Sequence, residues 1–99
     1  MKKVKILLGS GMNDSKAKKV VDEVKKNLEE KQICEAEIIY VNLLQNKDVS
    51  KYEDSCDFAI TAGQNMNTKL KVINGRNLVY SFLGTDSVYE DIKKVVEDL

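Results

Sequence analysis

The chain alternates between short apolar runs and longer segments in which apolar residues recur at helical spacing. The first run, Val4–Leu8, is interrupted only by Lys5 and ends at a glycine. A run of this kind is typical of a strand covered on both faces, as in parallel sheets. The segment Ser15–Lys31 has helical periodicity, so we expect a helix there, capped by the side chain of Asp14 or Ser15. Its apolar positions are Ala17, Val20, Val21, Val24 and Leu28.

Two further strands follow this helix. The β-branched stretch Glu35–Leu44 predicts a second strand, and Asp57–Ala62, which runs into Gly63, predicts a third. The polar stretch Asn46–Asp54 between them is interpreted as a short helix. The polar segment Gln64–Leu70 is interpreted as a loop or a helical turn.

The C-terminal part predicts one more strand and one more helix. Val72–Ile73 and the apolar run Leu78–Phe82 are interpreted as a fourth strand built around a turn at Asn74–Gly75. Ser87 and Glu90 have the spacing of a capping box, which predicts the start of a helix. The apolar positions of that helix are Val88, Ile92, Val95, Val96 and Leu99.

The alternation of strands and helices predicts the fold class. Such an alternation implies a parallel sheet with right-handed crossover connections. The 99 residues suit one α/β domain, residues 1–99, with four parallel strands and helices on both faces of the sheet. We expect the strand order 2-1-3-4 of flavodoxin-like sheets.

Composition and charge exclude several classes of function. Lys plus Arg and Asp plus Glu both number 16, so the chain lacks the positive surplus that binding to long nucleic acids requires. No apolar run approaches the roughly 20 residues of a membrane span. The absence of histidine removes the commonest general base. Cys34 and Cys56 have no CxxC spacing, so we expect a cytoplasmic protein without a metal or another cofactor.

The candidate site is the segment after the first strand. That strand is joined to the next helix by Gly9-Ser10-Gly11-Met12-Asn13-Asp14-Ser15. Ligands of open parallel sheets bind beyond the carboxyl ends of the strands, and the positive end of a helix dipole attracts anions. The two glycines allow backbone N–H groups to turn toward a ligand. We therefore expect phosphate, sulfate or a carboxylate here, beside Gly63–Thr68 and Leu83–Ser87, with Ser10 and Ser15 adding hydrogen bonds.

A structural explanation of the glycines stays open. Two glycines between a strand and a helix also permit tight packing without any ligand. The segment lacks the Gly-Lys-Ser/Thr ending of a P-loop, and a dinucleotide fingerprint would need a third glycine at Asp14. Asp14 would also repel an anion unless its carboxylate turns away to cap the helix. Cys34 and Cys56 precede strands at the opposite end of the sheet and are interpreted as structural thiols.

The run Ile6–Val24, ILLGSGMNDSKAKKVVDEV, resembles the start of the IIB subunits of the bacterial sugar phosphotransferase system, particularly the galactitol and ascorbate types. Those subunits open with a strand, a loop of the form C-G-x-G-x-x-[ST]-S, and a helix. A weaker similarity continues through Ser55–Thr61 and Val79–Gly84, so that the resemblance covers nearly the whole chain. The residues that match the two glycines and the final serine of the loop are Gly9, Gly11 and Ser15.

The resemblance implies a phosphoryl-carrier component of a sugar transport system. In that family a cysteine thiolate at the head of the loop accepts a phosphoryl group from a IIA protein and passes it to a sugar bound by the IIC membrane protein. The cysteine position is Leu8 in this chain, and Asp14 replaces the penultimate Ser or Thr. We therefore expect no phosphoryl transfer at the usual site. If the loop geometry is retained, Leu8→Cys should create a reactive thiol of low pKa.

Two alternatives to a phosphoryl carrier stay open. The first is a non-catalytic regulatory module that uses the same fold to bind an anion or a partner protein. The second is a small flavin-binding domain, although the chain is short for that function and aromatic residues to enclose a flavin are not evident. For a IIB-like domain, the resemblance implies a IIA-like phosphodonor and a IIC-like membrane transporter as partners.

Overall fold

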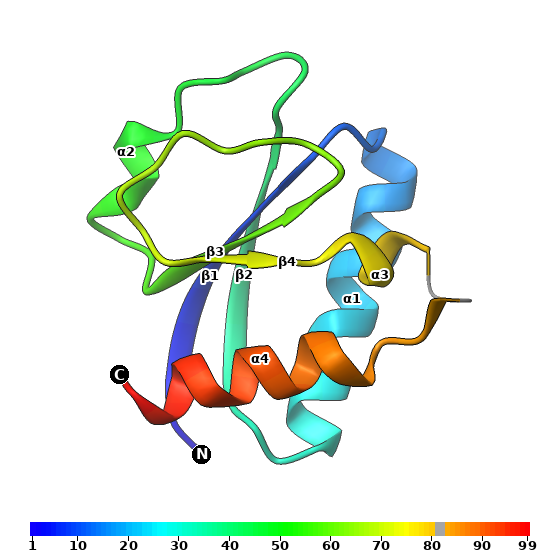
Figure 1. Cartoon of the computed structure of the whole chain (residues 1–99), viewed down its shortest axis with the longest axis vertical. Helices are drawn as coiled ribbons and strands as arrows, with labels where there is room; N and C mark the ends of the chain where they lie inside the picture. Colours follow the sequence, from blue (N-terminus) through cyan, green and yellow to red (C-terminus); the bar gives the residue numbers. More distant parts are fainter. Residues whose placement is uncertain (81–82) are drawn as a thin grey trace.

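The predicted strands form one parallel sheet in the predicted order, β2-β1-β3-β4 (Figure 1). This computed structural model describes residues 1–80 and 83–99. The strands are β1 (Lys3–Ser10), β2 (Glu35–Asn42), β3 (Phe58–Ala62) and β4 (Val72–Asn74). The helices are α1 (Asp14–Glu30), α2 (Ser50–Glu53), α3 (Arg76–Val79) and α4 (Asp86–Glu97).

The central strand β1 organises the sheet. It pairs with β2 along its whole length, from Lys3 opposite Glu35 to Ser10 opposite Asn42. On its other side it pairs with β3, where Ser10 lies opposite Ala62. Because β1 has a strand on each side and side chains packed on both faces, the near-continuous apolar run at the start of the sequence is explained.

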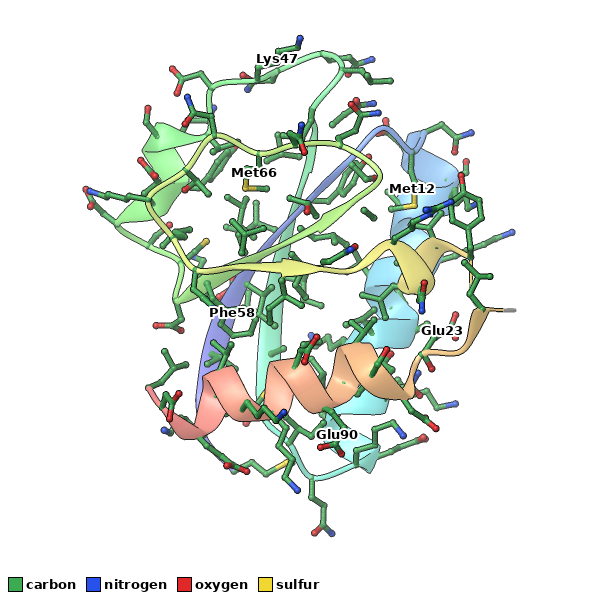
Figure 2. All side chains as sticks on the ribbon, viewed as in Figure 1. Met12, Glu23, Lys47, Phe58, Met66 and Glu90 are labelled. Carbon is green, nitrogen blue, oxygen red and sulfur yellow. The ribbon has the colours of Figure 1, made fainter. Side chains whose placement is uncertain are left out.

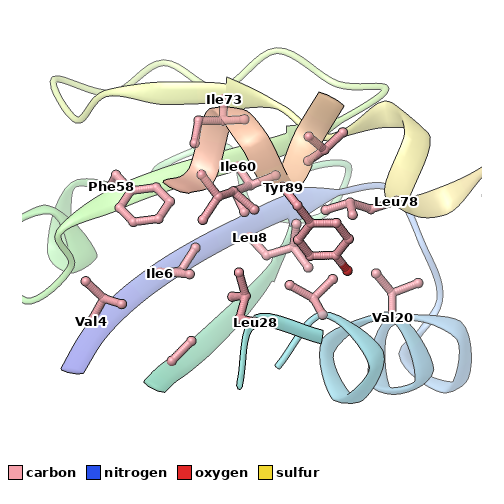
Figure 3. Close-up of a cluster of buried hydrophobic side chains, with 14 of the residues drawn as sticks. Val4, Ile6, Leu8, Val20, Leu28, Phe58, Ile60, Ile73, Leu78 and Tyr89 are labelled. Atoms are coloured by element: carbon pink, nitrogen blue, oxygen red, sulfur yellow. The ribbon is translucent and has the colours of Figure 1, made fainter. Parts of the chain in front are cut away.

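One face of the sheet, here called the helix face, carries the larger core. Ile6 and Leu8 of β1 and Phe58 of β3 are fully buried on it, beneath α1, α3 and α4 (Figure 3). The two long helices are joined there by a hydrogen bond at 3.0 Å, which Asn27 of α1 donates to the hydroxyl of Tyr89 of α4. The helices contribute Ala17, Val20, Val24, Leu28, Leu78, Val88, Ile92 and Val96 to this core.

The opposite face, here called the loop face, is covered differently. Leu7 and Ala59 project onto it and are fully buried. Their cover comes from the short helix α2 and the loops on either side of it and between β3 and β4. Helical cover on both faces is therefore present as predicted, but both long helices lie on the helix face. The covering residues are Leu43, Val49, Tyr52, Cys56, Met66 and Leu70.

The predicted fourth strand is correct only in its first part. The structure ends β4 at Asn74, and Leu78 and Val79, which were expected to extend it, lie in α3. The physical reason is local, because Asn74 Oδ1 accepts a hydrogen bond from the backbone N–H of Arg76 at 3.1 Å and turns the chain out of the sheet. Phe82, the last residue of that predicted strand, lies outside the described residues.

Both predicted helix caps are wrong. Asn13, and not Asp14 or Ser15, caps α1, since its Oδ1 accepts a hydrogen bond from the backbone N–H of Lys16 at 2.9 Å. The capping box of Ser87 does not form, because α4 already begins at Asp86 and Ser87 therefore has helical backbone.

Glu53 of α2 ties down the loop between β3 and β4. Its Oε2 accepts hydrogen bonds from Thr68 Oγ1 at 2.6 Å and from the backbone N–H of Lys69 at 2.7 Å. The hydrogen bond from Thr68, followed by that from Lys69, holds the pKa of Glu53 below its usual value. The ionised carboxylate thus helps to keep this loop on the loop face.

We expect Glu53→Gln to lower the melting temperature most at neutral pH. Because the pKa of Glu53 is lower in the folded state, its stabilising contribution is present above the unfolded pKa and is lost as the pH falls through the folded pKa. The difference in Tm between wild type and Glu53→Gln should therefore shrink on acidification, as measured by circular dichroism.

Glu90→Gln is the matched control, since the Glu90 carboxylate makes no hydrogen bond or ion pair within residues 1–80 and 83–99. It should show little difference from wild type at either pH. A Glu53→Gln difference that grows in acid would contradict the role assigned to this carboxylate.

Candidate functional site

The structure divides the predicted loop Gly9–Ser15 into three parts. Gly9 and Ser10 belong to β1, Gly11–Asn13 make the connection, and Asp14 and Ser15 are the first residues of α1. Among the described glycines only Gly63 and Gly84 have positive φ angles. The backbone freedom expected of Gly9 and Gly11 is therefore not used.

Close packing limits what the two glycine positions can hold, and it does so more strictly at Gly9. A Cβ placed on Gly9 would lie 2.5 Å from Met66 Cε and 2.9 Å from Leu43 Cδ1. A Cβ placed on Gly11 would lie 2.9 Å from Leu44 Cδ1. At such distances a neighbouring side chain must move. Leu43 is buried, so packing accounts for Gly9, whereas Leu44 is exposed and free to shift, so packing alone does not require a glycine at position 11.

Ser10 is a structural residue. It is 1% exposed, and its Oγ accepts a hydrogen bond from the backbone N–H of Met12 at 3.2 Å and lies 3.1 Å from the Tyr40 hydroxyl. Tyr40 in turn donates to the Met12 carbonyl oxygen at 2.7 Å. Ser10 is thus engaged inside the protein and does not face a ligand, contrary to expectation.

Tyr40 is the residue of this site that sequence reasoning missed. It lies opposite Leu8 in the register of β1 and β2, two residues before β2 ends. The sequence signal was a hydroxyl-bearing side chain near the carboxyl end of a strand beside β1. Asn42 supports the same turn, since its Nδ2 donates to the Met12 carbonyl oxygen at 3.3 Å.

The backbone N–H groups of the segment are partly engaged already. The N–H of Met12 is bonded by Ser10, and the N–H of Lys16 by Asn13. The helix start leaves the N–H groups of Asp14 and Ser15 without an intrahelical acceptor. Since Asn13 caps α1, the exposed Asp14 carboxylate remains on the same first turn, where it would repel an anion.

Leu8, the position of the family cysteine by resemblance, lies in the core. It is 1% exposed and its side chain points among Val20, Ile60 and Tyr89 (Figure 3). Two further strand residues separate it from the turn. Because burial disfavours the thiolate, this geometry predicts an unreactive Leu8→Cys thiol in place of the reactive one expected from the sequence.

The two natural cysteines are buried as well. Cys34 and Cys56 precede β2 and β3, at the amino end of the sheet and away from the loop, as predicted. Burial raises the pKa of the Cys34 thiol to about 11, and desolvation raises that of Cys56. Neither thiol is a ready nucleophile at neutral pH.

The other two predicted loop segments lie differently with respect to the turn. Gln64 of Gly63–Thr68 reaches it, with Nε2 3.7 Å from a Cβ placed on Gly11. Thr68, by contrast, turns to α2. Leu83–Ser87 follows α3 and not a strand, and its last two residues, Asp86 and Ser87, already belong to α4.

Apolar and cationic side chains flank the turn on its outer side. Leu44 is 62% exposed and Tyr80 is 44% exposed. The ammonium of Lys16 lies 5.7 Å from the centre of the Tyr80 ring. We call Gly11–Ser15 together with Leu44, Lys16 and Tyr80 the loop surface. Figure 2 places Met12 and Lys47 at this same end of the molecule.

Comparison of the sequence with protein-family models finds no match, and a search of curated protein sequences finds none. Within residues 1–80 and 83–99, no helix combines the length and the apolar character needed to cross a membrane. Any function is therefore argued from the fold and from the geometry of this edge of the sheet.

We expect the thiol of Leu8→Cys to react with iodoacetamide at least about tenfold more slowly than a free thiol in the native state, because the position is buried. Ser15→Cys is the matched control, since Ser15 is exposed at the start of α1, where a thiolate is favoured. Peptide mass spectrometry measures both rates, and denaturant should make Leu8→Cys fully reactive. Faster alkylation of native Leu8→Cys than of a free thiol would place residue 8 in the loop and contradict the structure.

Proposed function

We propose that this chain is a IIB-like domain that acts as a non-catalytic binding module, engaging a partner protein at the loop surface without accepting a phosphoryl group. The observation that carries this proposal is the position of Leu8. The residue that would carry the phosphoryl group in the family is here an apolar side chain, 1% exposed within a strand.

The fold supports the IIB-like part of the proposal. A turn and a long helix directly after β1 are what the resemblance implies, and here they lie in a four-stranded parallel sheet of order β2-β1-β3-β4. The matching residues Gly9, Gly11 and Ser15 lie close together between β1 and the first turn of α1. Fold alone does not determine function, so the activity is argued from the side chains at the carboxyl edge of the sheet.

The side chains at the carboxyl edge of the sheet support the proposal that the module is non-catalytic. A phosphoryl carrier needs a nucleophile that is activated by a base or by a lowered pKa. Ser10 is held by Tyr40 and Met12, both thiols lie at the other end of the sheet, and the chain contains no histidine.

The loop surface supports protein binding. Exposed Leu44, which lies beside Gly11, and exposed Tyr80 provide apolar anchors, and Lys16 adds a positive charge next to the Tyr80 ring. Aromatic and aliphatic anchors with a polar rim are typical of protein interfaces. The resemblance suggests a IIA-like phosphodonor or a IIC-like transporter as the partner, which places the proposed activity in the cytoplasm.

The proposal is tested with a phosphorylated IIA protein of the galactitol or ascorbate type. We expect intact-mass analysis to show no phosphoryl adduct on this chain, because no activated nucleophile lies at the edge. In ¹⁵N amide spectra, the signals of Gly11–Ser15 and Leu44 should shift on addition of the same protein.

Leu44→Ala should weaken this binding by about fivefold or more, as loss of an apolar interface anchor does. Leu99→Ala is the matched control, since Leu99 is 49% exposed but lies at the end of the chain after α4. A phosphoryl group found on Cys34 or Cys56 would contradict the proposal that the module is non-catalytic. Equal weakening by the two variants, or amide shifts with inorganic phosphate alone, would remove the protein-binding assignment.

A further inference from the structure

A second candidate site lies beside the loop surface, at the carboxyl ends of β3 and β4. It is a notch of about 380 Å³, here called the β3–β4 notch. Its polar lining comes from Thr61 at the end of β3, Gln64 and Asn65 of the following loop, Asn74 at the end of β4, and Arg76 at the start of α3.

The notch exists because cover on the loop face is incomplete. The side chains of α2 and its neighbouring loops pack over β1, β2 and β3, and none of the apolar residues of that cluster comes from β4. Val72 of β4, which also lines the notch, is accordingly 38% exposed. The chain leaves β3 through Gly63, which lines the notch and has a φ of +79°, in the left-handed region that favours glycine.

The charge of this notch sets it apart from four other surface depressions formed by the described residues. Each of those four is lined by at least one carboxylate, whereas the β3–β4 notch contains Arg76 and no acidic residue. The carboxylates of the other four depressions are Glu29, Glu35, Glu37 and Asp57; Asp91 and Asp98; Asp48 and Glu53; and Asp86 and Glu90.

Arg76 is the single arginine of the chain, and it is not neutralised within the described part. No carboxylate of residues 1–80 and 83–99 lies within ion-pair distance of its guanidinium. Its neighbour is the ring of Tyr80, whose centre lies 5.9 Å away. A guanidinium that stacks on a ring can still donate two parallel hydrogen bonds to a phosphate or carboxylate.

The neutral side chains of the notch add hydrogen-bond donors. Asn74 Oδ1 already accepts from the Arg76 backbone N–H, so the amide nitrogen is the part of Asn74 left to bind a ligand. The side chains of Gln64 and Asn65 make no hydrogen bond to another described residue. An unpaired guanidinium together with amide donors and no carboxylate is a lining suited to an anion.

We propose that the β3–β4 notch binds a small organic anion, whose phosphate or carboxylate pairs with Arg76 and whose polar remainder contacts Asn74, Gln64 and Asn65. Its volume is in the lower part of the range of sites that hold small organic ligands, and it exceeds what one inorganic ion fills. This inference does not rest on the proposed function, because it uses neither Leu8 nor Leu44, and of the loop surface it uses only Tyr80, as the neighbour of the Arg76 guanidinium.

The chain offers a specific probe for the test. Because it contains one arginine, a ¹⁵N-labelled sample has a single arginine Nε–H signal, which reports on the notch directly. We expect that signal and the Asn74 side-chain amide signals to shift saturably with glycerol 3-phosphate or with citrate. Inorganic phosphate should bind more weakly, and glycerol should cause no shift. The stronger of the two organic anions distinguishes a phosphate from a carboxylate ligand.

Two variants and one control complete the test. Arg76→Gln removes the charge, and Asn74→Asp keeps the acceptor for the Arg76 backbone N–H while adding a negative charge, so each should weaken binding by about tenfold or more. Lys47→Gln removes a positive charge from a depression that also contains Asp48 and Glu53, and it should change affinity less than about twofold.

Non-saturable shifts, or equal weakening by Lys47→Gln, would overturn the proposal in favour of general charge attraction. Shifts centred on the amides of Gly11–Ser15 would overturn it in favour of the loop surface. Leu44→Ala serves to separate the two proposals, since it should weaken binding of the partner protein and leave anion binding at the notch unchanged.

Discussion

The burial of β1 on both of its faces is the constraint on which the rest of this molecule depends. Because β1 pairs with two strands and continues through Ser10, Leu8 is enclosed in the core of the helix face. The same continuation presses Gly9 against Leu43 and Met66 on the loop face. Because the strand continues two residues beyond the end of the apolar run, only Gly11–Asn13 are left as a turn. Four of the seven residues predicted as a loop, Gly9–Ser15, therefore belong to β1 or α1.

The uneven cover of the sheet follows from the lengths of the connections. α1 and α4 have 17 and 12 residues and bury regular apolar stripes on the helix face. The connections on the loop face contain only the four-residue α2, so single side chains such as Val49 and Met66 provide the cover. Glu53 compensates by fixing the β3–β4 loop through Thr68 and the backbone of Lys69. The loop face of β4 lies beyond these hydrogen bonds and has no such apolar cover from the described residues.

Elements fixed by periodicity were predictable from the sequence, and those fixed by one hydrogen bond were not. The parallel sheet, α1 and the apolar face of α4 follow from patterns that extend over many residues. The end of β4 depends on one bond from the Arg76 backbone to Asn74, and the cap of α1 on one side chain, Asn13, which lies next to the two residues expected from the sequence. The role of Tyr40 depends on the register of β2 against β1, which hydrophobic patterning alone cannot assign to a residue.

The two regions at the carboxyl edge differ in how far their polar groups are already satisfied. In the loop surface, Ser10, Asn13 and Tyr40 bond the groups around the turn, and the carboxylate of Asp14 adds a negative charge beside the remaining N–H groups. Internal bonding of this kind rigidifies a turn and reduces what it can offer to an anion. The β3–β4 notch has the opposite character, because Arg76 has no carboxylate partner within the described residues and no acidic residue lines the depression. Anion recognition at this edge is therefore better served by the end of β4 than by the glycine segment, whose exposed apolar neighbours suit a protein surface.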